Sequence, residues 1–80
     1  MGRESLSAAF ARVLRQEREA KGLSQETLAH KAGVHRTYVG LIERGLRKPT
    51  IEVGYALARA LGTSLSELIR EAEKRLQRGG

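Results

Sequence analysis

The chain has 80 residues, of which 40% are hydrophobic and 30% charged, a balance typical of one folded domain over residues 1–80 and not of a disordered segment. It contains no cysteine, which excludes a disulfide framework, a thiolate nucleophile and a sulfur-ligated metal site. The net charge of +6 favours a polyanionic partner, whereas an aromatic share of 4% argues against a surface on which single-stranded bases stack.

The first predicted helix spans residues 6–20. Ser5 precedes it as a candidate N-cap, and Gly22 follows it as a residue able to adopt the left-handed conformation that ends many helices. Its apolar positions recur at helical spacing, at Leu6, Phe10, Val13 and Leu14.

Two short helices are predicted next, at residues 25–32 and from about 36 to 44, around a glycine turn at Gly33. Ser24 is the candidate cap of the first of them, and Gly45 ends the second. The residues expected to face inward are Leu28, Ala29, Ala32, Val34, Val39 and Ile42. This layout is typical of a helix-turn-helix that places its second helix in a DNA groove, although a purely structural helical hairpin would need the same small residues.

A basic loop then leads to Thr50, the candidate cap of a fourth helix over residues 51–61. The apolar period of this helix gives a core set of Ile51, Gly54, Leu57, Ala58 and Leu61. Gly54 leaves a gap in that set. Either another side chain, such as Tyr55 or Phe10, fills the gap, or the next helix approaches closely.

Ser64 and Glu67 have the spacing of a capping box, which opens a fifth helix over about residues 65–77. Its apolar face comprises Leu65, Leu68, Ile69, Ala72 and Leu76. Residues 1–4 and the final QRGG are expected to be loose ends. Because no segment alternates apolar and polar residues as a strand does, the fold class is predicted to be all-α, with five helices and short connections.

Several motifs follow one another in an order specific to one family: LSQETLAHKAGV, RTYVGLIERG, RKPT, ALARALG and SLSEL. Over about residues 6–69 the chain resembles the Xre family of phage-repressor-type regulators. It is also similar to the controller proteins of restriction–modification systems, through AFxRVLRxxRxxKG at residues 9–22 and RTYVxxIERG at residues 36–45. The resemblance implies a compact lambda-repressor-like domain that binds a double-stranded DNA operator and regulates transcription.

The start of the third helix carries the residues expected to contact bases. Arg36 can donate two hydrogen bonds to guanine, and Thr37 offers a hydroxyl and a methyl group. Tyr38 could contact a phosphate or a base edge, or pack on the dimer side of the groove. Leu41 stands where the family often reads a base, or it is simply buried. Each of the polar three could also be an ordinary solvated side chain.

The predicted phosphate contacts flank that helix. Gln25 lies at the first turn of the second helix, where free backbone amides favour an anion, and in the family a glutamine at this position contacts the DNA backbone and braces the recognition helix. Arg44, Arg47 and Lys48 follow the third helix and could clamp phosphates across the groove, or could form a merely solubilising loop.

The resemblance also implies a structural salt bridge between Arg18 and Glu43, which we expect to be partly buried and to tie the first helix to the third. Gly40, in the middle of the third helix, disfavours a helix by about 1 kcal/mol relative to alanine. It either lets the backbone approach DNA or is tolerated without a function.

The fifth helix is longer than a domain of this size needs, so it is also the predicted dimerisation element. The expected dimer-interface residues are Leu65, Leu68, Ile69 and Ala72. The alternative is a helix that packs only within its own chain. A twofold dimer would present two recognition helices about 34 Å apart, one turn of B-DNA, and would read a near-palindromic operator.

Other classes of function have less support. An antitoxin-type or other protein-interaction module could share this fold. An enzyme is not expected, because the sequence lacks paired carboxylates, a glycine-rich phosphate loop and HExxH. No metal, cofactor or small-molecule ligand is expected, since His30 and His35 have no companion ligands. No apolar run reaches the length of a membrane span and MGRESLSAAF lacks the apolar region of a signal peptide, so we expect a cytoplasmic protein.

Overall fold

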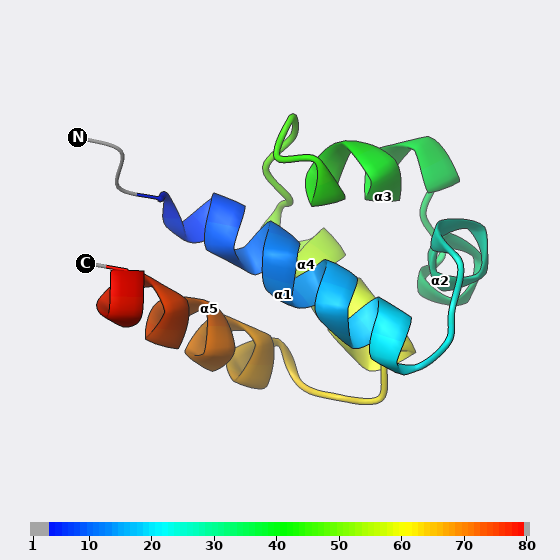
Figure 1. The fold of residues 1–80 in the computed structure, drawn as a ribbon. Coiled ribbons are helices and arrows are strands. Elements are labelled where there is room, and N and C mark those ends of the chain that lie inside the picture. The colour runs from blue at the N-terminus through cyan, green and yellow to red at the C-terminus, as the bar shows by residue number, and fades with distance from the viewer. Residues whose placement is uncertain (1–3, 80) are drawn as a thin grey trace.

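A computed structural model describes residues 4–79, the last two by their backbone alone. Its elements are α1 (Leu6–Ala20), α2 (Gln25–Ala32), α3 (Arg36–Glu43), α4 (Ile51–Ala60) and α5 (Leu65–Gly79), and residues 4–79 include no strand. The helix α1 runs through the middle of the molecule, with α5 along one side of it and α3 on the other (Figure 1). The all-α prediction is therefore confirmed.

The helix starts follow from local side-chain chemistry. The hydroxyls of Ser5, Ser24, Thr50 and Ser64 each accept a hydrogen bond from the amide three residues further on, at 3.0–3.1 Å. Each cap satisfies one of the amides that a first helical turn leaves free. The predicted capping box of α5 is half formed, because the Glu67 carboxylate lies 3.7 Å from Arg70 Nε, one turn further along the helix.

The core is built from one face of each helix. Its largest fully buried side chains are Leu14, Leu28, Val39, Ile42, Leu57 and Leu68. Ala29 is also buried, and Ala32 and Val34 are half-buried against the same cluster. Small residues on α2 allow it to approach α3, and Gly33 between them has a φ of +75°, which a residue with a Cβ adopts reluctantly.

The gap at Gly54 is filled from two directions. A Cβ at this position would stand 3.2 Å from Leu65 Cδ1 and 3.8 Å from Phe10 Cζ. Of the two side chains named for this role, Phe10 therefore contributes and Tyr55 does not. Tyr55 is half exposed, and its hydroxyl accepts a hydrogen bond from Arg59. The absence of a side chain on α4 is what lets α5 approach it closely.

Two predictions are wrong. Ile51 was assigned to the core but is 77% exposed at the first position of α4. Residues 78 and 79 were expected in a loose tail but continue α5, where Leu76 packs against the core and Arg75 donates a hydrogen bond to Gln16 of α1. Residues 1–3 and 80, also predicted to be loose, lie outside the described residues.

Candidate nucleic-acid interface

A buried ion pair joins α1 to α3. Arg18 Nε donates to Glu43 Oε2 at 2.7 Å, and a second guanidinium nitrogen donates to Oε1 at 3.0 Å. The third nitrogen donates to the Leu23 carbonyl at 2.7 Å. The Glu43 side chain is only 2% exposed. Its hydrogen bond to Arg18 raises the pKa of that guanidinium group, against the opposing effect of burial.

Gln25 connects this pair to α2. Its side-chain amide donates from Nε2 to Glu43 Oε1 at 2.9 Å, across the angle between the first turn of α2 and the end of α3. The three helices that carry the site are therefore joined through one carboxylate. A brace by Gln25 was implied by the family resemblance, but its partner was not, because nothing in the sequence ties residue 25 to residue 43.

Four predicted contact residues line one polar cleft of ≈ 370 Å³ between α2 and α3: Gln25, Arg36, Thr37 and Arg44. The other lining residues are Glu26 and Gly40. Arg36 and Thr37 are exposed at the start of α3. His35 caps this helix, because its Nδ1 accepts a hydrogen bond from the Thr37 amide at 3.1 Å.

Sequence reasoning missed Glu26, the one acidic residue lining the cleft. Its carboxylate lies 3.4 Å from a guanidinium nitrogen of Arg36, and both side chains are largely exposed. Exposed pairs of this kind contribute little stability, about 0–1 kcal/mol. Both residues of this pair line the cleft. No periodicity could have revealed it, since the two residues lie on different helices across the Gly33 turn.

Tyr38 and Arg47 form a second group. The Arg47 guanidinium carbon lies 5.7 Å from the centroid of the Tyr38 ring, within the range of a cation–π contact. Tyr38 is half-buried and packs against the core, and Leu41 is also half-buried. Neither side chain is as free as the exposed Arg36 and Thr37, and neither lines the cleft.

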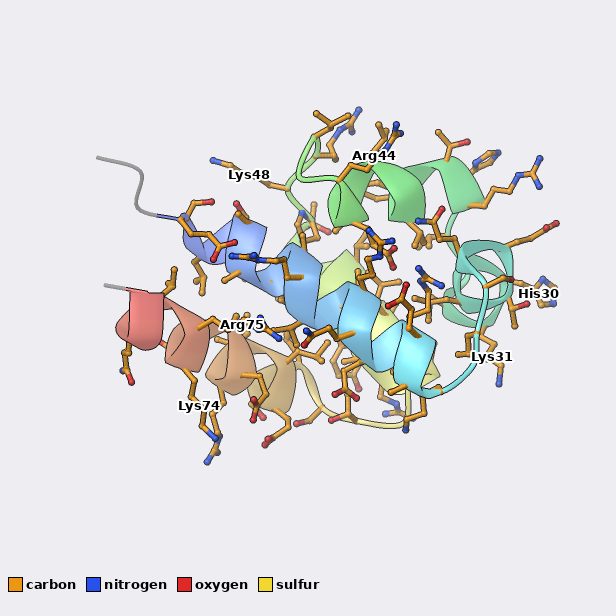
Figure 2. The ribbon with its side chains drawn as sticks, viewed as in Figure 1. His30, Lys31, Arg44, Lys48, Lys74 and Arg75 are labelled. Carbon is orange, nitrogen blue, oxygen red and sulfur yellow. The ribbon has the colours of Figure 1, made fainter. Side chains whose placement is uncertain are left out.

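Basic side chains extend this surface beyond α3. Arg44 and Lys48 project on the α3 side of the molecule, whereas Lys74 projects from α5 on the opposite side (Figure 2). Arg44 Nε donates to the Gly40 carbonyl at 3.2 Å, and Arg47 and Lys48 are exposed in the loop that follows. Leu46 in the same loop is 66% exposed.

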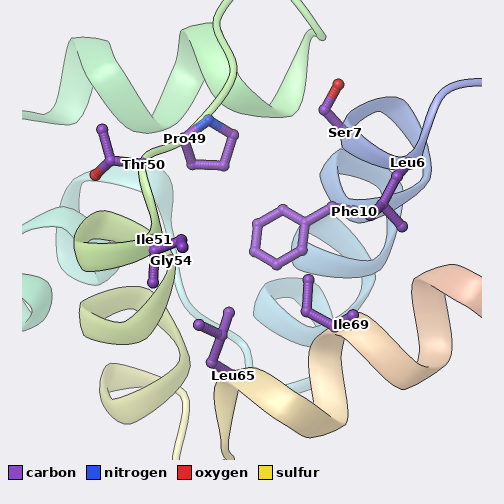
Figure 3. A pocket seen from close by; sticks show the side chains of 9 residues that line it. All are labelled: Leu6, Ser7, Phe10, Pro49, Thr50, Ile51, Gly54, Leu65 and Ile69. Carbon is purple, nitrogen blue, oxygen red and sulfur yellow. The ribbon is translucent and has the colours of Figure 1, made fainter.

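A separate apolar groove of ≈ 360 Å³ lies where α1, α4 and α5 meet (Figure 3). It is lined by Leu6, Ser7, Phe10, Pro49, Thr50, Ile51, Gly54, Leu65 and Ile69. Two predicted interface residues, Leu65 and Ile69, therefore reach the surface. Leu68 and Ala72 do not, because both are buried within the chain's own core. They have no surface to offer a second chain, which corrects their assignment.

Two further features are absent from residues 4–79. No group of three or more His, Cys, Asp or Glu side chains is placed to hold a metal ion. No helix in this part of the chain has the length and apolarity needed to cross a membrane.

Known proteins with the same architecture are similar in sequence as well. The sequence profile of the helix-turn-helix family matches residues 14–68. Control protein C.SmaI of Serratia marcescens is 43% identical over 60 residues, which cover 75% of this chain and 71% of that protein. The restriction-modification controller protein C.AhdI of Aeromonas hydrophila superposes with a TM-score of 0.75 at 47% identity, covering 78% of this chain and 94% of its own.

A second solved structure shows a protein of this kind bound to DNA. It is the tetramer of the controller protein C.Esp1396I in complex with its natural 35 base-pair operator. The superposition has a TM-score of 0.83 at 32% identity and covers 92% of this chain and 99% of that one.

Proposed function

The chain belongs to the Xre-type helix-turn-helix family, and we propose that it is a sequence-specific DNA-binding regulator of transcription that occupies a near-palindromic operator as a homodimer. It acts through binding alone, on DNA in the cytoplasm. Within the family, a controller protein of a restriction–modification system is the candidate that the relatives favour, because C.SmaI and C.AhdI are both similar over most of this chain.

The observation that carries the proposal is the convergence of Gln25, Arg36, Thr37 and Arg44 on one cleft between α2 and α3. A phosphate at the first turn of α2 would receive backbone amides from that helix and charge from the neighbouring guanidinium groups. With the phosphate held there, the first turn of α3 faces the major groove. Gln25 and Arg44 are assigned to the DNA backbone on this basis.

The base-reading roles follow from exposure. Arg36 and Thr37 are the exposed side chains at the start of α3 and are assigned to base edges. Tyr38 and Leu41, both half-buried, remain in the proposed base-contact set at its edge. Arg47 and Lys48 extend the phosphate-binding surface along the loop after α3.

The homodimer is assigned to the apolar groove. Ile51 at 77% and Leu6 at 42% exposure leave apolar surface uncovered next to Leu65 and Ile69. A second copy of the chain is the occupant that a twofold operator reader requires, because two recognition helices must be held one helical turn of DNA apart. The proposed dimer face is therefore Leu65 and Ile69 of α5 together with Leu6 and Ile51.

The experiment that tests the function is selection of bound duplexes from random DNA, followed by affinity measurements on the enriched sequence. We expect a near-palindrome with half-sites about one helical turn apart. Arg36→Ala should weaken binding to the selected duplex by about 1–3 kcal/mol and relax selection at one position of each half-site.

Arg70→Ala is the matched control. Arg70 is exposed, lies on α5 and pairs only with Glu67 of its own helix among the described residues. Its loss should leave both affinity and selectivity unchanged. Enrichment of no consensus, or equal effects of the two arginine substitutions, would contradict the proposed function.

A further inference from the structure

Gly40 lies in the middle of α3, where its backbone conformation does not require a glycine. Its φ is not among the positive values found in residues 4–79, which all belong to glycines just after helix ends. A glycine inside a helix is less favourable than alanine at the same place. Gly40 is moreover buried, so its missing side chain concerns packing inside the protein.

The packing partner is Gln25. A Cβ added to Gly40 would stand 3.3 Å from Gln25 Oε1, which is tighter than most contacts that a Cβ makes, and 4.0 Å from Gln25 Cδ, which is an ordinary van der Waals contact. Gln25 cannot withdraw freely, because its Nε2 donates to Glu43 Oε1 at 2.9 Å. Glu43 is itself fixed by its two hydrogen bonds from Arg18.

We propose that Gly40 is a positioning residue of the proposed DNA-binding surface that α2 and α3 form. Its missing side chain leaves the space through which the Gln25 carboxamide passes from α2 to Glu43, one turn further along α3. This contact fixes the first turn of α2 against the recognition helix and thus sets Gln25 relative to Arg36 in their shared cleft. The consequence for DNA rests on the proposed function, whereas the packing itself does not.

The packing is tested by a double-mutant cycle in urea unfolding with Gly40→Ala, Gln25→Ala and the double variant. With Gln25 present, we expect Gly40→Ala to lower the urea midpoint, because the new methyl group displaces the carboxamide from Glu43. With alanine at position 25, the same substitution should raise the midpoint, because only the helix preference of alanine remains. Equal shifts in the two backgrounds would overturn the proposal.

Gly54→Ala is the matched control for this coupling. Gly54 is also a buried helical glycine, and a Cβ there would stand 3.2 Å from Leu65 Cδ1. Gln25 is not among its neighbours. Its effect on the urea midpoint should therefore be the same with glutamine or alanine at position 25, and dependence on residue 25 would show that the cycle reports general destabilisation instead of contact.

A spectroscopic readout separates positioning from stability. The Gln25 side-chain amide resonances are assigned in nitrogen-15 NMR spectra by their absence from Gln25→Ala. In folded Gly40→Ala these resonances should shift and exchange with water faster, because the bond to Glu43 is lost. Resonances and exchange rates unchanged from the parent would contradict the assignment of Gly40.

The DNA consequence is measured on the duplex selected by the parent protein. Gly40→Ala should weaken binding several-fold when Gln25 is present and cause no further loss when residue 25 is alanine. An equal loss in both backgrounds would mean that Gly40 meets DNA through its own backbone, which overturns the positioning role. Failure of the parent to bind any duplex disproves the proposed function, while the urea cycle and the NMR spectra still decide the packing.

Discussion

At the scale of single residues, the Glu43 carboxylate organises the site. It accepts hydrogen bonds from Arg18 on α1 and from Gln25 on α2, while belonging to α3 itself. A buried ion pair costs desolvation that its own attraction barely offsets, so its net contribution to stability is modest when intact. Its value here is geometric, because three helices meet at one group with two acceptor oxygens.

Removing one partner of the pair should destabilise the protein far more than the intact pair stabilises it. Arg18→Ala strands the Glu43 carboxylate, which is 2% exposed, and should lower the free energy of unfolding by about 3–5 kcal/mol in urea. Arg15→Ala, which removes an exposed pair with Glu19 on the same helix, should change it by less than about 0.5 kcal/mol. Equal urea midpoints for the two variants would show that the pair is not structural.

At the scale of the elements, the sequence predicted what local chemistry decides. Four of the five helix starts were marked by a serine or threonine cap, and most of the ends by glycines, so the bounds agree within one or two residues. Predictions failed where neighbours decide. Ile51 fits the helical period of α4 yet is 77% exposed, because residues 4–79 leave most of that side chain uncovered. The end of α5 was missed because its support comes from Gln16 on α1.

The exposed end of α4 gives a prediction about dimerisation. Ile51→Asp should leave the protomer folded, since the side chain is 77% exposed within one chain. In a twofold dimer, the same change buries two unpaired charges, each costing about 3–5 kcal/mol. The dimer dissociation constant should therefore rise by about ten-thousandfold or more, as measured by sedimentation equilibrium.

Leu46 provides a control for that experiment, because it is a strongly exposed aliphatic side chain that, unlike Ile51, lies outside the groove. Leu46 is 66% exposed in the loop after α3. Leu46→Asp should sediment as the parent does, because the substitution adds the same charge away from the proposed interface. If Ile51→Asp also sedimented as the parent does, the groove would not be the dimer face.

At the scale of the whole molecule, residue types and family resemblance predicted the proposed DNA contacts but not how these side chains are paired with their neighbours. Gln25, Arg36, Thr37 and Arg44 do share one cleft. The Glu26 carboxylate beside Arg36 and the stacking of Arg47 on Tyr38 were not predictable, because each depends on how separate segments are placed. Leu68 and Ala72 were misassigned for the same reason, since helical periodicity predicts which face of a helix is apolar but not which element covers that face.

We expect the strength of DNA binding to depend on where the basic side chains lie, and not only on the net charge of +6. Each neutralised phosphate releases counterions, so log K falls linearly with log salt, with a slope of about −0.9 per contact. Lys48 lies on the α3 side, and Lys48→Ala should reduce the slope by about 1 for each protomer bound. It should also weaken binding equally on selected and unrelated duplexes, because a phosphate contact carries no sequence information.

Lys74→Ala removes the same charge from α5 and should leave the slope unchanged. Identical slopes for the two variants would mean that Lys48 does not contact the DNA backbone. The positive charge of the protein would then attract DNA only through its overall electrostatic potential.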